Sequence, residues 1–138
     1  MKRKLSITPT YIKNLSYTDF VGMINQWNVL PGSYVTLSKW ACYSGLNNKS
    51  NLLEVACTTG FSSRELSLLS GCEGEGFDLS KKSVIMANYN KEKYAPNINF
   101  SYKICDGYKY KTNKPFTHIV VGASLGFFPA PVKMLKKC

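Results

Sequence analysis

Short apolar runs alternate with helical patterns along most of the chain. Leu52, Leu53 and Val55 form a run that suits a buried strand, and the turn at 58–60 ends it. Residues 62–70 then repeat apolar positions at helical spacing. Strands that alternate with helices are typical of an α/β fold with a parallel sheet. The same reasoning predicts strands at 51–57, 73–78, 98–104 and 117–122, and helices at 62–70 and 80–93.

The N-terminal third has a helical pattern without strands. Residues 16–27 follow a plausible N-cap and place apolar side chains on one face of a short amphipathic helix. A second helix begins at Ser33 or Thr36 and closes at Gly45. These patterns divide the chain into a helical cap, 1–48, and an α/β core, 49–138, whose last residues, 129–138, look like the start of a helix.

The turn after the first strand points to a bound nucleoside. Gly60 precedes a helix N-terminus, where free N–H groups favour a polar or anionic ligand. Asp78 ends the second strand, 24 residues after Glu54, where nucleoside-binding folds place an acid for the ribose hydroxyls. Ala56 and Thr58 occupy the first two glycine places of the dinucleotide pattern, which disfavours a pyrophosphate. Glu54 can instead bind the ammonium of an amino-acid-bearing nucleoside, which describes S-adenosylmethionine.

Four motifs in register resemble those of the class I S-adenosylmethionine-dependent methyltransferases. Residues 54–60 resemble the first motif, an acid that ends an apolar strand before a glycine-rich loop, although two of its three glycines are absent. Residues 77–80 resemble the second motif, 105–107 the third, and 118–123 the strand and loop of the fourth. The resemblance spans 51–125 and implies a Rossmann-like three-layer sandwich.

The resemblance also implies where the cofactor binds. Glu54 and the main chain of 56–60 would hold the methionine end, and Asp78 would bind the ribose hydroxyls. Leu79 would pack on the adenine, and Asp106 would accept a hydrogen bond from its amino group. The predicted cofactor-binding residues are Glu54, Ala56, Cys57, Thr58, Gly60, Asp78, Leu79, Asp106, Gly107 and Gly122.

The chain provides only part of the sheet that this family implies. A full sheet would have seven strands in the order 3-2-1-4-5-7-6, whereas the sequence supplies four in the order 3-2-1-4. The last three strands are missing, so we interpret the chain as a fragment, a truncated product, or a half completed by another chain. Strand 117–122 would lie at an open edge, which predicts a homo-oligomer through that strand. The alternative is a monomer whose terminal helix covers the edge.

The sequence does not identify the acceptor or a catalytic base. Residues 122–129 contain neither the Asn or Asp before Pro-Pro-aromatic that is typical of base-amine methyltransferases nor the Pro-Cys of cytosine C5 enzymes. This loop suits a small or partly apolar acceptor, or simply packs on the sheet. His118, the sole histidine, lies at the wrong end of its strand for catalysis. Aromatic side chains of the cap could hold the sulfonium or belong to the core; the substrate-pocket candidates are Tyr11, Tyr17, Trp27, Tyr34 and Ser124.

Charge and cysteine content limit the kinds of partner and the cell compartment that the sequence predicts. The net charge is +10, but only two of the 18 basic residues are Arg and the lysines are scattered. Nucleic-acid enzymes more often cluster Arg with exposed aromatics, so we favour a solvated basic surface over an acidic partner or nucleic acid. The five cysteines include no C-x-x-C pair, which predicts no metal site and a cytoplasmic protein. Residues 1–9 lack an apolar signal segment, and no apolar run is long enough to span a membrane.

Three functions therefore remain open from the sequence. The first is a small-molecule methyltransferase, represented here by its cofactor-binding portion. The second is a noncatalytic S-adenosylmethionine-binding or assembly module, which the missing strands suggest. The third is an RNA-directed methyltransferase, for which the only motive is the positive charge.

Overall fold

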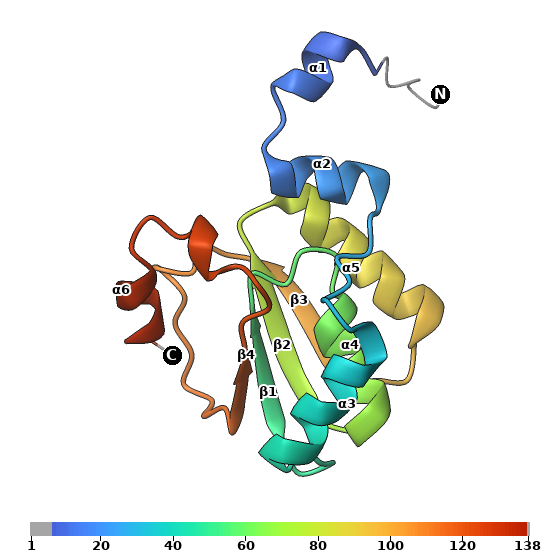
Figure 1. Ribbon diagram of the computed structural model, residues 1–138, viewed down its shortest axis with the longest axis vertical. Helices are drawn as coiled ribbons and strands as arrows, with labels where there is room; N and C mark the ends of the chain where they lie inside the picture. The colour runs from blue at the N-terminus through green and yellow to red at the C-terminus, as the bar shows by residue number, and fades with distance from the viewer. Residues whose placement is uncertain (1–6, 138) are drawn as a thin grey trace.

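The fold is a parallel sheet with helices packed on one face and mainly loops on the other (Figure 1). The computed structural model describes residues 7–137, so the predictions that rest on residues 1–6 and on Cys138 lie outside the described residues. Its strands are β1 (Asn51–Val55), β2 (Glu73–Asp78), β3 (Phe100–Ile104) and β4 (His118–Val120). Its helices are α1 (Pro9–Lys13), α2 (Tyr17–Ile24), α3 (Ser33–Ser44), α4 (Phe61–Ser70), α5 (Lys81–Tyr94), the 3-10 turn η1 (Leu125–Phe127) and α6 (Pro131–Leu135).

The sheet has the predicted strand order, β3-β2-β1-β4, and all of its pairings are parallel. This confirms the Rossmann-like α/β class and places β4 at one edge of the sheet. Three strands are shorter than predicted, and β3 begins at Phe100 instead of residue 98. β1 ends at Val55 because Ala56 has a φ of 54°, which is left-handed and incompatible with a strand. β4 covers only three residues of the predicted 117–122.

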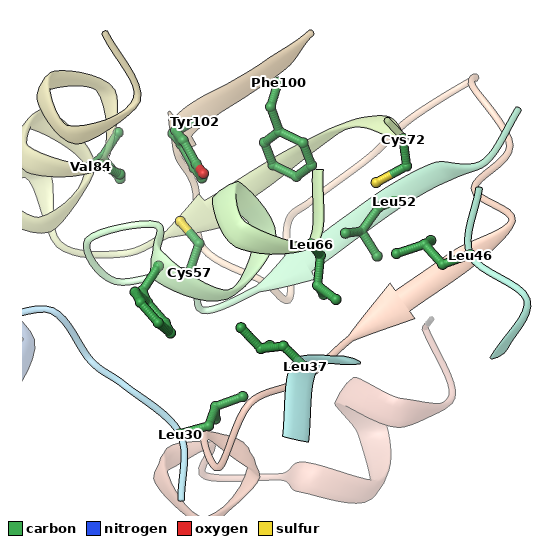
Figure 2. Packing of buried hydrophobic residues seen from close by; sticks show 12 residues of the cluster. Leu30, Leu37, Leu46, Leu52, Cys57, Leu66, Cys72, Val84, Phe100 and Tyr102 are labelled. Carbon is green, nitrogen blue, oxygen red and sulfur yellow. The ribbon is translucent and has the colours of Figure 1, made fainter. Parts of the chain in front are cut away.

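The two crossover helices, α4 and α5, cover the same face of the sheet, as right-handed connections require (Figure 1). The core beneath them joins Leu52 of β1, Phe100 of β3, Leu66 of α4 and Val84 of α5 (Figure 2). Leu37 adds α3 of the cap to the same cluster. The apolar positions that predicted these elements are thus the ones that hold them together.

The opposite face is covered without a crossover helix. The segment 105–117, η1 and α6 lie against it (Figure 1). Phe77 of β2 stacks on Tyr110 with ring centroids 4.6 Å apart, and Met134 of α6 completes a second, smaller core with Val55. The third layer of the sandwich is therefore mainly loop.

Helix α2 packs closely across the N-terminal end of α5. Ser80 Oγ donates to Asp19 Oδ1 (2.6 Å), and Ser83 Oγ donates to the carbonyl oxygen of Thr18 (2.6 Å). The side-chain amides of Asn25 and Asn90 exchange two hydrogen bonds, 3.0 and 2.8 Å long. The cap is thereby fixed next to the carboxyl end of β2.

Helix α1 was not predicted from the sequence. α1 is a single short turn, and Thr8 caps it by accepting from the N–H of Tyr11 (3.1 Å), with Pro9 at its first position. A five-residue helix is too short to show an apolar period. Among residues 7–137, no helix combines the length and the apolar character needed to cross a membrane.

Candidate functional site

The loop after β1 is strained and tightly held. Ala56 and Thr58 both have positive φ, 54° and 46°, as does Gly60 at 75°. A Cβ at Gly60 would lie 2.7 Å from the ring of Tyr102, whose hydroxyl donates to the Gly60 carbonyl (3.1 Å). Glycine is therefore required here by contact with β3, whereas the sequence had suggested close approach to a ligand.

Glu54 is a buried acid at the end of β1. Ser63 donates to Glu54 Oε2 twice, from its hydroxyl (2.5 Å) and from its backbone N–H (3.3 Å). The Ser63 hydroxyl also lies 3.0 Å from the Tyr102 hydroxyl. Burial raises the pKa of Glu54 to about 7, and the hydrogen bonds from Ser63 only partly oppose that rise. Near neutral pH this side chain therefore exists in both protonation states.

Asp78 is buried at the carboxyl end of β2 and orders the loops on both sides. Its Oδ2 accepts from the N–H of Thr58 (3.0 Å), and its Oδ1 accepts from the N–H of Ser80 (2.8 Å). Burial raises the pKa of Asp78, while these backbone hydrogen bonds work against the rise. The N–H of Leu79 also interacts with this carboxylate. A carboxylate has about four acceptor positions, so it keeps some capacity for a ligand.

Relief of the loop strain is testable at Ala56. We expect Ala56→Gly to raise the free energy of unfolding by roughly 0.5–1 kcal/mol, because left-handed backbone is costly for alanine and nearly free for glycine. Ala130, with a φ of −134°, provides the matched control, and Ala130→Gly should be neutral or destabilising. Urea unfolding of the two variants measures both effects. Equal destabilisation by the two substitutions would mean that Ala56 is not strained.

A cavity of about 180 Å³ joins this loop to the cap and to the segment after β4. Four predicted cofactor-binding residues line it, namely Glu54, Ala56, Thr58 and Gly122. The remaining wall comes from residues that the sequence did not single out: Asn28, Val29, Leu30, Pro31, Ser62 and Ala123. The α2–α3 loop that holds 28–31 contains the dipeptide Pro31-Gly32, which is typical of a turn but does not show what the loop faces.

The other predicted cofactor residues do not line this cavity. Leu79 is 74% exposed and free to be covered by a ligand. Asp106 Oδ1 accepts from the N–H of Tyr108 (2.9 Å). Gly107 is buried, and an added Cβ would meet Met134 and Phe77 of the second core. Cys57 is also buried, and burial raises the pKa of its thiol, which disfavours a reactive thiolate.

The aromatic candidates of the cap serve different contacts. Trp27 lies 4.5 Å from the guanidinium of the buried Arg64, so its ring faces a cation of the protein itself. Tyr34 packs edge-on against Phe61, at 6.0 Å between ring centroids.

Two further candidates face the carboxyl edge, and one more lies on α1. Tyr17 of α2 stacks parallel to Phe127 of η1 at 5.9 Å, which links the cap to the segment after β4. The hydroxyl of Ser124 is buried without a hydrogen-bond partner among the described residues. The ammonium of Lys82 lies 6.0 Å from the ring centroid of Tyr11 on α1.

Comparisons with known proteins define the class of fold. No protein-family model and no curated protein matches the chain. The plantazolicin methyltransferase BpumL, solved in complex with S-adenosylhomocysteine, superposes with a TM-score of 0.65 at 18% identity, over 93% of this chain and 47% of BpumL. A Haemonchus contortus N-methyltransferase, solved with phosphomonomethylethanolamine and S-adenosylhomocysteine, gives 0.75 at 17% identity, over 93% and 31%. The chain has the Rossmann-like fold of the S-adenosylmethionine-dependent methyltransferases.

Sequence similarity is higher to one further solved structure. The MccD protein is 33% identical, with a TM-score of 0.73 over 80% of this chain and 49% of MccD. The chain spans about half the length of the MccD and BpumL chains that it matches.

Proposed function

We propose that the chain binds S-adenosylmethionine at the carboxyl edge of its sheet and is the cofactor-binding portion of a methyltransferase that acts on a small molecule. The observation that carries the proposal is the buried carboxylate of Glu54 in a cavity shared with Ala56, Thr58 and Gly122. Two structural neighbours were solved with S-adenosylhomocysteine bound, which supports the choice of cofactor.

The residues present fit the methionine end of this cofactor. A cavity of about 180 Å³ next to Glu54 has room for the amino-acid part of the ligand. Ser63 uses one oxygen of Glu54, so the carboxylate keeps acceptor capacity for an ammonium group. The ionised form of Glu54 is the one that binds the ammonium, and a cation next to it would favour that form.

The adenosine end would extend from this cavity toward β2 and β3. Asp78 has acceptor positions left for ribose hydroxyls, and the exposed side chain of Leu79 offers an apolar surface for the adenine. Asp106 follows β3 at the same edge of the sheet. These three positions are the ones that the motifs predicted, and we retain their roles as part of the proposal.

The bound cofactor supplies a methyl group on a positively charged sulfur, ready for direct displacement. The chain's own residues would act by orientation, since Glu54 and Asp78 fix the two ends of the ligand and the loop at 28–31 closes one side. No side chain is assigned as a general base. An acceptor that is already nucleophilic needs none.

A second function, a noncatalytic S-adenosylmethionine-binding or assembly module, is favoured by one specific observation. The chain spans about half of the BpumL and MccD chains, and an acceptor pocket can require the other half. Turnover of the cofactor by the chain together with a small-molecule acceptor supports the first function. Retention of the cofactor without turnover across an acceptor screen supports the second.

The exposed edge of the sheet indicates how copies of the chain could associate. β4 pairs only with β1, and Ile119 on β4 is 37% exposed. We infer a cytoplasmic homo-oligomer formed through this edge. Light scattering of the purified chain should give a multiple of the monomer mass, and a monomer mass at all concentrations would contradict the inference.

Calorimetric titration with S-adenosylhomocysteine tests the proposed site through Asp78. We expect Asp78→Asn to weaken binding by roughly 10- to 100-fold, the effect of losing hydrogen bonds to a charged acceptor. Glu92→Gln removes an exposed carboxylate on α5 and should bind like the wild type. Unchanged affinity in a folded Asp78→Asn variant would remove Asp78 from the site, and no binding by the wild type would overturn the proposed function.

A further inference from the structure

A second cavity lies on the loop-covered face of the sheet, at the amino ends of the strands. It measures about 170 Å³ and shares no lining residue with the cavity at Glu54. Asn51, Glu73, Glu75 and Ser101 line it from three neighbouring strands, and Lys114 lines it from the segment 105–117. These strand residues are cross-strand neighbours, because Asn51 pairs with Glu73 and Glu75 pairs with Ser101 in the parallel register. The cavity is therefore polar and built on rigid elements.

One of the lining residues, Asn51, carries a buried acceptor without a partner among the described residues. Asn51 is only 7% exposed, and its Nδ2 donates to the carbonyl oxygen of Pro115 (2.7 Å), which fixes the orientation of the amide. Its Oδ1 is buried and has no hydrogen-bond partner among the described residues. A buried oxygen without a donor costs free energy, so the site favours a molecule that brings one.

The two carboxylates of the cavity already accept hydrogen bonds from other side chains. Glu73 accepts from Lys114 Nζ (2.7 Å) and from Asn99 Nδ2 (2.7 Å). Glu75 accepts from Lys103 Nζ (2.8 Å) and from the Tyr110 hydroxyl. The hydrogen bond and charge of Lys114 lower the pKa of Glu73. Partial burial acts to raise the pKa of Glu75, but the hydrogen bonds from Lys103 and Tyr110 outweigh it and lower that pKa.

The lysines at this cavity can give way to a ligand. The side chains of Lys114 and Lys103 are 60% and 42% exposed, so either can turn into solvent. Exposed ion pairs contribute little to stability, which makes their exchange for another cation cheap. A cation that takes the place of Lys114 would then meet the Glu73 carboxylate, and the unpaired oxygen of Asn51 belongs to the residue that pairs with Glu73 in the sheet.

We propose that this cavity binds a guanidinium group, which replaces the Lys114 ammonium at Glu73 and donates to the free oxygen of Asn51. A guanidinium carries five N–H donors in a rigid plane and is weakly hydrated, so it can serve several acceptors at once. An ammonium is more strongly hydrated and offers fewer donors, as the exposed lysine at this site illustrates. The inference is independent of cofactor binding, because the two cavities lie on opposite faces of the sheet.

Amide chemical shifts of the ¹⁵N-labelled chain test this site with methylguanidinium as the probe. We expect saturable shifts at Gly74 and Ser101 in the millimolar range, and about tenfold weaker binding in Glu73→Gln, which loses a charged acceptor but keeps its shape. Glu92→Gln, which removes an ion-paired carboxylate outside the cavity, should bind like the wild type. Unchanged spectra elsewhere in Glu73→Gln show that the variant is folded.

Two further probes test whether binding needs N–H donors and whether the guanidinium can belong to a peptide. Tetramethylammonium has the same charge but no N–H donor and should produce no saturable shift at these amides. N-acetyl-arginine methylamide asks whether the group can come from a peptide, and binding as tight as that of methylguanidinium would assign the site to arginine side chains. The absence of saturation with methylguanidinium, an equal response to tetramethylammonium, or an equal loss in Glu92→Gln would identify a merely water-filled notch and overturn the proposal.

Discussion

Replacing Glu54 with Gln is expected to stabilise the fold above pH 7 and to weaken cofactor binding in the same variant. The buried carboxylate costs free energy when it is charged, and burial raises its pKa from 4.5 to about 7. At pH 8 we expect Glu54→Gln to raise the free energy of unfolding by about 2–3 kcal/mol, since the amide still offers an oxygen to Ser63. Binding of S-adenosylmethionine should fall by roughly 10- to 100-fold at the same pH.

The pH dependence of stability determines the direction of the expected stability change. The folded protein holds the Glu54 proton up to about pH 7, whereas the unfolded chain releases it near pH 4.5. The contribution of Glu54 to stability is therefore full below pH 4.5 and is lost as the pH rises through 7. Glu54→Gln should remove this slope, so that the difference between wild type and variant shrinks as the pH falls and levels off below pH 4.5. Urea unfolding at a series of pH values measures it, with Glu92→Gln as the control that keeps the wild-type slope. A variant that is less stable than the wild type at pH 8 would contradict the assignment.

Adding one methyl group at Gly22 is expected to be among the most damaging small changes in the chain. A Cβ there would lie 2.3 Å from the backbone nitrogen of Ser83 and 2.5 Å from the carbonyl carbon of Lys82. Backbone atoms of α5 cannot move singly, so α2 must shift away as a unit. We expect Gly22→Ala to lower the free energy of unfolding by about 3 kcal/mol, even though alanine favours a helix more than glycine does.

A matched glycine separates this clash from a general effect of substitution. A Cβ at Gly126 meets no atom within 4 Å, so Gly126→Ala should leave the midpoint of thermal unfolding nearly unchanged. The Gly22 variant should also loosen the hydrogen bond between Asp19 and Ser80 and weaken S-adenosylhomocysteine binding, because Ser80 directly follows the proposed adenosine segment. Equal thermal midpoints for the two variants would show that α2 does not pack on α5 as described.

The sheet could be predicted because the sequence patterns of its strands are recognisable. Leu52 and Val55 of β1 lie in a short apolar run that suits a buried strand, and α5 begins after an N-cap, Ser80, that the sequence displays. The end of β1 was misjudged because the left-handed turn at Ala56 uses an alanine where glycine is the usual signal.

Only those parts of the site that belong to sequence motifs could be predicted. Glu54 and Asp78 were predicted because each lies at the end of a strand, at a fixed place in a known pattern. The wall at 28–31 was missed because a loop in the cap has no period to relate it to β1. Trp27 was predicted as a pocket candidate, and the buried Arg64 that it faces could not be foreseen, since Arg64 lies on α4 and a cation–π contact leaves no pattern in the sequence.

Chemical-shift mapping of the ¹⁵N-labelled chain with S-adenosylhomocysteine tests cofactor binding most directly. If the cofactor lies at the carboxyl edge as proposed, saturable shifts will concentrate at the amides of 56–60, at Ser80 next to Asp78, and at Gly122. The amides at the opposite end of the sheet, such as Gly74, should not move. Saturating ligand that shifts none of the amides at the carboxyl edge, or shifts only those at the other end, would contradict the proposed function.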